Sequence, residues 1–352
     1  MQRDRKGYPP MGEEIKSYSY EGIKKLLAGL GQPQFRAKQI VQWLYQKGVS
    51  SYDEMSNIPA NLREALGKEA PLHPSVIADK RVSADGTRKY IVRFHDGAET
   101  EMVGIPSKDR LTVCFSTQVG CPMGCTFCAT GREGFTRNLL PGEMVDQVML
   151  VQEDFGERVS NVVGMGQGEP LLNYDNVLAA LRFLNSPDGL NIGARRITIS
   201  TCGLLQGIGQ FAREPEQFTL AISLHSAIQE TRDDIMPALM NQTLPSLKKA
   251  VQRYQEESGR RVTYEYVMIN GVNDDMEHLK ALIHFCRGTL CHVNLIPVNG
   301  VEGTGYVPSN SDASALFLKE LTSKGIEATI RQSRGADIAG ACGQLKNAKQ
   351  EL

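Results

Sequence analysis

The spacing of apolar residues in the first part of the chain indicates helices. In the segments "YEGIKKLLAGL", "QFRAKQIVQWLYQKG" and "ANLREALGKEA", apolar positions recur every three or four residues. This period places apolar side chains on one face of a helix. In the second segment the expected buried stripe consists of Ile40, Val41, Leu44 and Tyr45. The pattern predicts a helical accessory domain over residues 20–72, after a flexible tail at residues 1–19.

A short stretch with strand-like alternation follows. In "TRKYIVRFH" the residues Tyr90, Val92 and Phe94 occupy every second position, and an Asp-Gly pair lies on each side of the stretch. Alternation with a period of two is typical of a half-buried strand, and Asp-Gly pairs favour tight hairpin turns. Residues 73–110 are therefore predicted to form a small antiparallel β-meander.

From residue 111 onward, apolar strand-like runs alternate with helical segments. The strands are expected near residues 112–118, 161–166, 196–201, 218–224, 262–269, 292–298 and 327–332. Alternating strands and helices imply parallel strands joined by right-handed crossovers. Six such units are fewer than the eight of a closed barrel. The fold class is therefore α/β, with an open, partial (β/α) barrel over residues 111–345 and a C-terminal tail at residues 346–352.

Composition and charge narrow the class of protein. The chain of 352 residues has 22% charged residues and a formal net charge of −1, which argues against a general nucleic-acid coat protein but leaves room for a local basic face. It has no apolar run near the roughly eighteen residues of a membrane span. Eight cysteines in a chain that opens on no recognisable signal or transit peptide indicate reduced thiols. We expect a soluble, cytoplasmic protein with no membrane association.

Three of the cysteines lie together directly after the first predicted barrel strand. Cys121, Cys125 and Cys128 fall within "CPMGCTFC", in a loop at the carboxyl end of a strand, where barrel enzymes place their chemistry. Three thiolates suit an iron–sulfur cube in which one iron stays open to an outside ligand. The alternative is a zinc site completed by a distant His or Cys. No role is assigned to the remaining cysteines, which are expected to pack in the core or to be incidental: Cys202, Cys286 and Cys291.

The spacing C-x3-C-x2-C, with Phe127 before the last cysteine, resembles the signature of the radical S-adenosylmethionine superfamily. Longer motifs resemble, in order, its dual-specificity adenine C2-methyltransferases: "CFSTQVGCPMGCTFCATGREGFTRNL", "GEPLLNYDNV", "RRITIST", "ISLHSA", "YEYVMINGVND", "NLIPVN" and "GADIAGACGQL". The resemblance extends from about Tyr20 to Leu345. One departure is Gln167 in "GMGQGEP", where relatives often carry methionine.

This resemblance implies two cofactors. Cys121, Cys125 and Cys128 would hold a 4Fe-4S cluster, and the amine and carboxylate of S-adenosyl-L-methionine would chelate its open iron. The residues implied to contact S-adenosyl-L-methionine are Gly168, Glu169, Ser200, Ser223, Leu224, His225 and Asn299. Without the resemblance, small polar residues at strand ends are often only helix caps.

The activity implied by the resemblance is methylation of adenine carbon 2. The expected targets are an adenosine of the peptidyl-transferase centre in 23S rRNA and, in bacteria, the adenosine next to the tRNA anticodon. Carbon 2 lies between two ring nitrogens and is too electron-poor to attack a sulfonium methyl group. A radical that adds to this carbon removes that obstacle.

The resemblance also implies three residue roles. Cys342 would carry a methyl group from one of two S-adenosyl-L-methionine molecules, Cys114 would close a transient disulfide with it, and Glu101 would accept the proton from carbon 2. From the residues alone, both thiols could simply pack in the core. Strand alternation would place Glu101 on one face with Val103 and Ile105, where an apolar setting raises a carboxyl pKa.

Implied partners are 23S rRNA and tRNA, with the target base splayed out of its stack. A flavodoxin- or ferredoxin-like protein would supply electrons to the cluster. We expect the enzyme to be a monomer. The basic residues that could hold RNA backbone are Lys24, Lys25, Arg36 and Lys38. Three alternatives stay open at this point. One is methylation at carbon 8 of the same adenosine, although "PSNSDA" and "GEPLLN" resemble the C2 group more. The others are a radical enzyme that modifies peptides and a zinc-bearing RNA-binding module.

Overall fold

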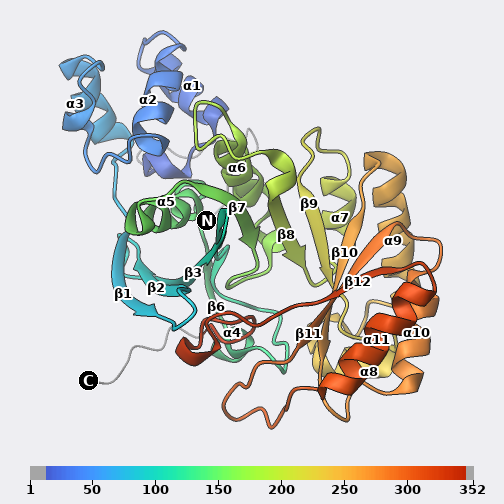
Figure 1. Ribbon diagram of the computed structural model, residues 1–352. Coiled ribbons are helices and arrows are strands. Elements are labelled where there is room, and N and C mark those ends of the chain that lie inside the picture. Colours follow the sequence, from blue (N-terminus) through green and yellow to red (C-terminus); the bar gives the residue numbers. More distant parts are fainter. Residues whose placement is uncertain (1–12, 346–352) are drawn as a thin grey trace.

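A sheet of ten strands runs through the computed structural model, which describes residues 13–345 (Figure 1). Its strand order is β1-β2-β3-β4-β7-β8-β9-β10-β11-β12, and β5 pairs with β6 in a separate small sheet. The strands are β1 (Val76–Val82), β2 (Arg88–Arg93), β3 (Glu99–Ser107), β4 (Arg110–Cys114), β5 (Gln118–Gly120), β6 (Phe135–Asn138), β7 (Val159–Gly164), β8 (Ile197–Thr201), β9 (Thr219–Ser223), β10 (Val262–Met268), β11 (Cys291–Pro297) and β12 (Glu327–Ile330).

Two kinds of strand pairing meet in this sheet. The strands β1 to β4 pair antiparallel, as a meander. From β4 to β12 the pairings of the large sheet are parallel. The sheet stays open, because β1 and β12 lie at its two edges. The predicted open α/β fold is therefore confirmed, and the meander continues the same sheet.

The helices lie outside the curved sheet and beyond one end of it. In Figure 1, α7, α9, α10 and α11 follow its outer side, and α1 to α3 form a group beyond α5 and α6. The helices are α1 (Tyr20–Gly29), α2 (Arg36–Tyr45), α3 (Ala60–Glu69), α4 (Ala129–Glu133), α5 (Pro141–Phe155), α6 (Tyr174–Asn185), α7 (Leu205–Phe211), α8 (Gln229–Ile235), α9 (Leu244–Ser258), α10 (Met276–Cys286) and α11 (Ser311–Ser323). Within residues 13–345, no helix combines the length and the apolar character that crossing a membrane requires.

The first barrel strand ends earlier than the predicted range 112–118. Beyond Cys114, the backbone N–H groups of Thr117 and Gln118 donate to the carbonyl of Gln167, at 2.8 and 3.3 Å, in the loop after β7. With these bonds the chain leaves its pairing with the neighbours of β4 and begins β5. The cysteine loop that follows is thereby brought over the carboxyl ends of the parallel strands.

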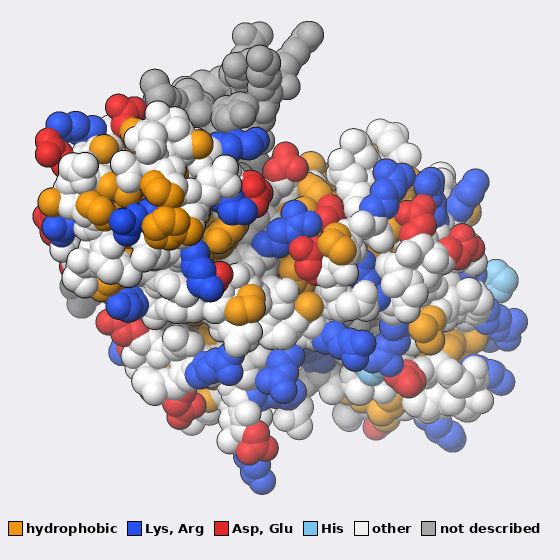
Figure 2. All heavy atoms as spheres, turned by 90° about the horizontal axis from the view of Figure 1, so that it is seen from above, with side chains coloured by type: hydrophobic (Ala, Val, Ile, Leu, Met, Phe, Trp, Pro, Cys, Tyr) orange, Lys and Arg blue, Asp and Glu red, His pale blue; other side chains and the backbone are white. Residues whose placement is uncertain are grey.

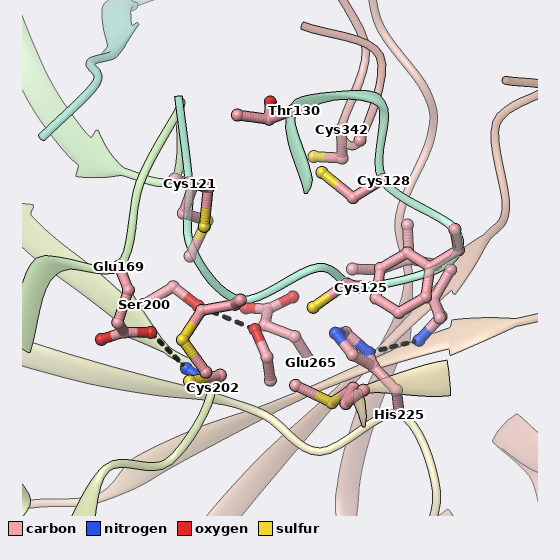
Figure 3. A pocket seen from close by; sticks show the side chains of 18 of the residues that line it. Cys121, Cys125, Cys128, Thr130, Glu169, Ser200, Cys202, His225, Glu265 and Cys342 are labelled. Atoms are coloured by element: carbon pink, nitrogen blue, oxygen red, sulfur yellow. Dashed lines mark hydrogen bonds between the residues drawn. The ribbon is translucent and has the colours of Figure 1, made fainter. Parts of the chain in front are cut away.

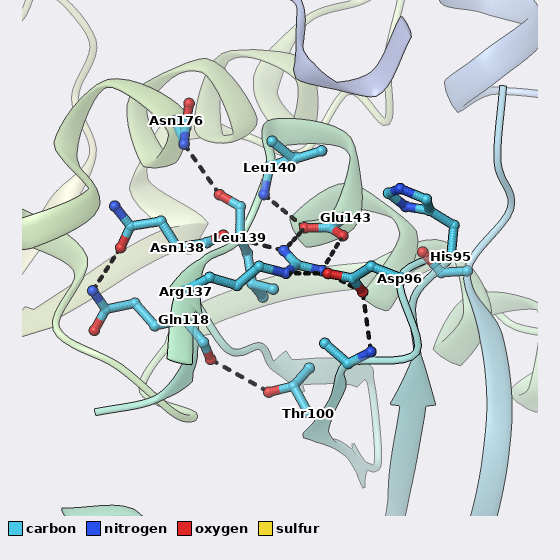
Figure 4. A network of polar contacts seen from close by, with 12 residues as sticks. His95, Asp96, Thr100, Gln118, Arg137, Asn138, Leu139, Leu140, Glu143 and Asn176 are labelled. Atoms are coloured by element: carbon cyan, nitrogen blue, oxygen red, sulfur yellow. Dashed lines mark hydrogen bonds and ion pairs between the residues drawn. The ribbon is translucent and has the colours of Figure 1, made fainter. Parts of the chain in front are cut away.

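The guanidinium group of Arg137 fixes strand β6, which follows the cysteine loop in sequence (Figure 4). Arg137 of β6 donates to Asp96, at 2.7 and 3.1 Å, and to Glu143, at 2.8 Å through each of two nitrogens. Glu143 also accepts from the backbone N–H of Leu140, at 2.8 Å, and so caps α5. Arg137 therefore connects the turn between β2 and β3 to the first turn of α5.

The expectation of a flexible tail at residues 1–19 needs correction. Residues 1–12 lie outside the described part of the chain. Ile15–Ser17 form a short 3-10 helix in which Ile15 is fully buried. The ammonium group of Lys16 forms a buried ion pair with Asp146 of α5. These contacts anchor the segment to the core, because one apolar side chain and one lysine find partners that lie far away in sequence.

Burial of Glu14 makes stability depend on pH near neutrality. Desolvation raises the pKa of this carboxyl to about 7, Lys16 opposes the shift, and Glu143 and Asp146 add to it. A folded-state pKa above the unfolded one contributes stability that is complete below about pH 4.5 and is lost as the pH rises through 7. The free energy of unfolding of Glu14→Gln, relative to that of wild type, should therefore rise by about 2 kcal/mol when the pH is raised from 5 to 8. Urea unfolding at both pH values tests this, and an unchanged difference contradicts it.

Candidate active site

A cavity of about 170 Å³ opens at the carboxyl ends of the parallel strands (Figure 3). Its wall combines the loops after β7 to β11 with the cysteine loop and a C-terminal segment. The predicted residues that line it are Cys121, Cys125, Cys128, Gly168, Glu169, Ser200, Ser223, His225, Asn299 and Cys342. Among the predicted S-adenosyl-L-methionine contacts, Leu224 is the exception: its side chain is fully buried in the core, and its backbone N–H donates to the carbonyl of Glu265 at 3.0 Å.

The cysteine loop is held in place by its own backbone and by α8. The N–H of Cys121 donates to the carbonyl of Gly134 at 2.7 Å, and the N–H of Thr126 donates to the carbonyl of Ile235 at 3.0 Å. Burial raises the pKa of the Cys121 thiol to about 11 and that of Cys125 well above its ordinary value. Buried thiols of this kind become thiolates when a metal binds them.

Glu169 is anchored at one end of the cavity. Its two carboxylate oxygens accept from the backbone N–H groups of Leu171 and Cys202, at 2.9 and 2.8 Å. Burial raises its pKa, and these hydrogen bonds lower it. The preceding Gly168 has a φ of +104°, and a Cβ atom there would lie 2.6 Å from the side chain of Gln118. Only glycine fits at this position, so the backbone stays close to the cavity.

His225 lies at the other end and is neutral. Its Nδ1 accepts from the backbone N–H of Val267 at 3.1 Å, so the ring carries its proton on Nε2. Burial, with a smaller contribution from the charge of Arg232, lowers its pKa to about 3. The ring meets Phe127 edge-on, with centroids 4.8 Å apart. A φ of +57° is unusual for histidine, and Asn273 stabilises it by donating to the His225 carbonyl at 2.7 Å.

A second cavity, of about 130 Å³, adjoins the first and brings Cys114 and Cys342 together. Cys114 ends β4, whereas Cys342 lies in a turn of the C-terminal segment. Within the described residues both are free thiols. Burial raises the pKa of Cys114 to about 12, and the nearby charge of Cys342 adds to the shift. Cys342 also lines the first cavity, so its side chain faces both spaces.

The C-terminal segment is tied directly to the cysteine loop. The backbone N–H of Ala129 donates to the carbonyl of Gly343 at 2.7 Å, and the Thr130 hydroxyl donates to the carbonyl of Leu345 at 2.7 Å. Asn299 donates to the carbonyl of Cys342 at 3.0 Å. The cysteine loop and the Cys342 turn are therefore held as neighbours.

Glu101 lies on the predicted face of β3 but outside the residues that line the two cavities. Val103 and Ile105, on the same face, do line the second cavity. Glu101 is fully buried, and its Oε1 accepts from the Lys89 ammonium group at 2.9 Å. The expected apolar setting is thus replaced by a buried ion pair.

This ion pair should be visible in stability. Lys89→Met should lower the free energy of unfolding by about 3 kcal/mol, because it removes the cation beside a buried carboxylate. The double variant Lys89→Met/Glu101→Gln should recover most of that loss, since no charge is then left behind. Urea denaturation of wild type and the two variants measures both effects. A single variant as stable as wild type would show that the pair contributes nothing.

The sequence does not single out three further residues of the cavity wall. Cys202, expected to pack in the core only, lines the cavity and supports Glu169. Glu265 lies on β10, level with Ser223, and Arg331 follows β12. The Glu265 carboxylate accepts from Asn294 at 3.0 Å, and its other oxygen lies 3.9 Å from Arg331. A carboxylate within the apolar strand "TYEYVM" was the available signal.

The predicted RNA-holding residues have partners within the protein. Lys24 pairs with Glu21 at 2.7 Å, and Lys38 pairs with Asp188 at 3.2 Å. Arg36 donates to the carbonyl of Asn57 at 3.0 Å. In Figure 2 the Lys and Arg side chains of the N-terminal helices are interspersed with Asp and Glu and form no single patch. This surface is of mixed charge.

Comparison with known proteins places the chain in a family. The radical SAM superfamily matches residues 115–283, and the ribosomal RNA large subunit methyltransferase N-terminal domain matches residues 14–72. A probable dual-specificity RNA methyltransferase RlmN from Pelotomaculum thermopropionicum is 44% identical over 346 residues, which cover 97% of this chain and 94% of the relative. The chain belongs to this RlmN family.

Further members and a solved structure agree. The probable RlmN of Staphylococcus epidermidis is 44% identical over 343 residues, which cover 97% of this chain and 94% of the relative. A crystal structure of a radical SAM methyltransferase from Sphaerobacter thermophilus is 42% identical, with a TM-score of 0.89 over 95% of this chain and 99% of that chain. The family predicted from the sequence motifs is confirmed.

Membership in the radical SAM superfamily implies a 4Fe-4S cluster and S-adenosyl-L-methionine, and the cavity of this RlmN-family chain fits them. Three thiols from one loop line it, and the charge of Cys128 raises the pKa of both Cys121 and Cys125. Within residues 13–345, no three His, Cys, Asp or Glu side chains converge on a point that would hold one metal ion. Three thiols on one loop match the requirement of a cube in which each thiolate binds a different iron.

Proposed function

We propose that the protein methylates carbon 2 of an adenosine in 23S rRNA and of the adenosine next to the anticodon in tRNA. The family supports rRNA and tRNA as substrates, and the placement of Cys114 and Cys342 at one cavity beside the cysteine loop carries the proposal. Two thiols from distant parts of the chain share that cavity, one on a rigid strand and one in a turn.

The two cofactors supply a methyl group and one-electron chemistry that generates a carbon-centred radical. The thiolates of Cys121, Cys125 and Cys128 would hold the cluster. Glu169 would orient the ammonium group of S-adenosyl-L-methionine, because its carboxylate is fixed by two backbone N–H groups at one end of the cavity. Ser200 and Ser223, whose hydroxyls lie 3.3 Å apart, and Asn299 would position the rest of the molecule. His225 offers its Nε2 proton as a hydrogen-bond donor.

Cys342 would carry the methyl group to the base, since its side chain faces both cavities. The methyl carbon on Cys342 would lose a hydrogen atom and bond to carbon 2, and the adduct would give up one electron to the one-electron chemistry of the cofactors. The Cys114 thiolate would then attack the sulfur of Cys342, so that an S–S bond forms, the S–C bond breaks, and the released carbon takes up a proton to complete the methyl group. Glu101 would take the proton from carbon 2, which requires the wall of the second cavity to open towards this buried side chain. A thioredoxin-like reductant would return the disulfide to two thiols, in keeping with a reducing cytoplasm. We further propose a flavodoxin- or ferredoxin-like electron donor and a monomeric enzyme.

Nucleoside analysis tests the proposed reaction. In a strain that lacks the gene, 2-methyladenosine should disappear from 23S rRNA and tRNA digests, and a plasmid copy should restore it. Persistence of 2-methyladenosine would defeat the proposal. Loss of 8-methyladenosine instead would assign the sister reaction, and loss from rRNA alone would remove tRNA from the substrates.

A further inference from the structure

Arg232 of α8 is a buried arginine without an anionic partner. Its side chain is fully buried, and among the described residues Nη2 donates to the carbonyl of Cys202 at 2.7 Å whereas Nε and Nη1 have no hydrogen-bond partner. Within residues 13–345 no carboxylate accepts a hydrogen bond from it, although the charge of the adjacent Asp233 acts on its pKa. The described residues therefore contain a buried positive charge that no hydrogen-bonded anion balances.

Such a charge is expensive to bury. Desolvating an ion costs several kcal/mol, and a guanidinium group does not lose its proton near neutral pH. Desolvation does lower the pKa of Arg232, but from a value so high that the group stays charged. A buried charge of this kind normally lies beside an opposite one. An anionic group is therefore expected next to Arg232 in the working enzyme.

The cysteine loop lies beside this arginine. The carbonyl of Ile235, three residues along α8, accepts from the N–H of Thr126 within the loop, at 3.0 Å. Burial raises the pKa of Cys125, and the charge of Arg232 pulls it down. The same charge acts on the Cys202 thiol and on His225. Arg232 is thus close enough to influence the groups on that wall of the cavity.

A 4Fe-4S cluster in this loop would provide the missing anion. Three thiolates and an oxidised cube of charge +2 sum to −1, and one added electron makes the sum −2. The buried carboxylate of Glu169 adds negative charge to the same cavity. Each step towards the reduced state therefore gains from a nearby cation that water cannot screen.

We propose that Arg232 is the counter-charge of the cluster, a positioning residue that favours uptake of one electron from the donor. The inference rests on the cluster of the proposed function. Arg260 offers a matched control, because it is also a buried arginine with an unpartnered Nε. It lies just before β10, where it donates to the carbonyls of Glu216 and Phe218, away from the cysteine loop.

The reduction potential of the reconstituted cluster is the decisive measurement. Wild type, Arg232→Met, Arg232→Lys and Arg260→Met would be loaded anaerobically with iron and sulfide and titrated with dithionite under electron paramagnetic resonance. Arg232→Met should disfavour reduction at least tenfold, a fall of about 59 mV for one electron. Arg232→Lys should recover most of the difference because it keeps the charge, and Arg260→Met should match wild type. A cluster-loaded Arg232→Met protein with the wild-type potential would overturn the inference.

Stability of the metal-free chain gives a second readout. Without the cluster, Arg232→Met should be at least as stable as wild type in urea, since it removes an uncompensated buried charge. A metal-free Arg232→Met chain that is clearly less stable than wild type, or that fails to fold, would overturn the inference, because the arginine would then be structural. Wild type that takes up no iron and sulfide would overturn the proposed function, and this inference with it.

Discussion

Alanine in place of Cys342 is expected to abolish methylation of RNA. Turnover should fall by at least about 10³-fold, because the proposed reaction has no route without a sulfur that carries the methyl group. The variant should fold normally, since Cys342 is exposed as a residue and lies in a turn. Mass analysis of nucleosides from 23S rRNA incubated with each protein measures the loss.

Two further observations bear on this expectation. Cys286→Ala removes a buried thiol from α10, outside the residues that line the two cavities, and should retain activity. Peptide mass analysis of wild type should show a methyl increment on the fragment that contains Cys342. Measurable turnover by the Cys342→Ala enzyme is incompatible with a methyl group carried by this sulfur.

Replacing Cys125 with alanine is expected to remove the cluster. Wild type reconstituted anaerobically should hold roughly four irons per chain and be brown, whereas the variant should hold well under half as much iron, because one corner of the cube loses its thiolate. Iron and sulfide assays with visible spectroscopy measure the difference. Cys291→Ala serves as the control, since that thiol is buried near the opposite ends of the strands. A Cys125→Ala protein with the full iron content would show that the three cysteines do not hold the cluster.

Much of the fold could be predicted because its signals are local. The predicted stripe of Ile40, Val41, Leu44 and Tyr45 is buried on α2, and the predicted strands agree with the structure to within a few residues apart from the end of the first. That strand ends at Cys114 because Gln167, far along the chain, captures the backbone N–H groups of the following loop. Such a bond depends on the assembled sheet and leaves no local pattern.

The site divides in the same way. The cysteine loop and Gly168-Glu169 could be found because they are contiguous motifs at predicted strand ends. The Lys89–Glu101 ion pair could not, since it depends on the register of β2 against β3. Arg232 is also unmarked, because "QETRDDI" has the composition of an exposed helix. Arg232 is buried because α8 packs against the cysteine loop, which the sequence of α8 alone does not reveal.

The pairing of β3 with β4 fixes two of the proposed catalytic residues, whereas the third lies outside the sheet. Val103 pairs with Cys114 in that ladder, and Glu101 lies two residues from Val103, so the proposed base and the proposed resolving thiol share one rigid support. Cys342 belongs to no strand or helix, and glycines stand at 340 and 343. In the proposed reaction the methyl group would move with this turn, which would first have to release its hydrogen bonds to Ala129 and Asn299.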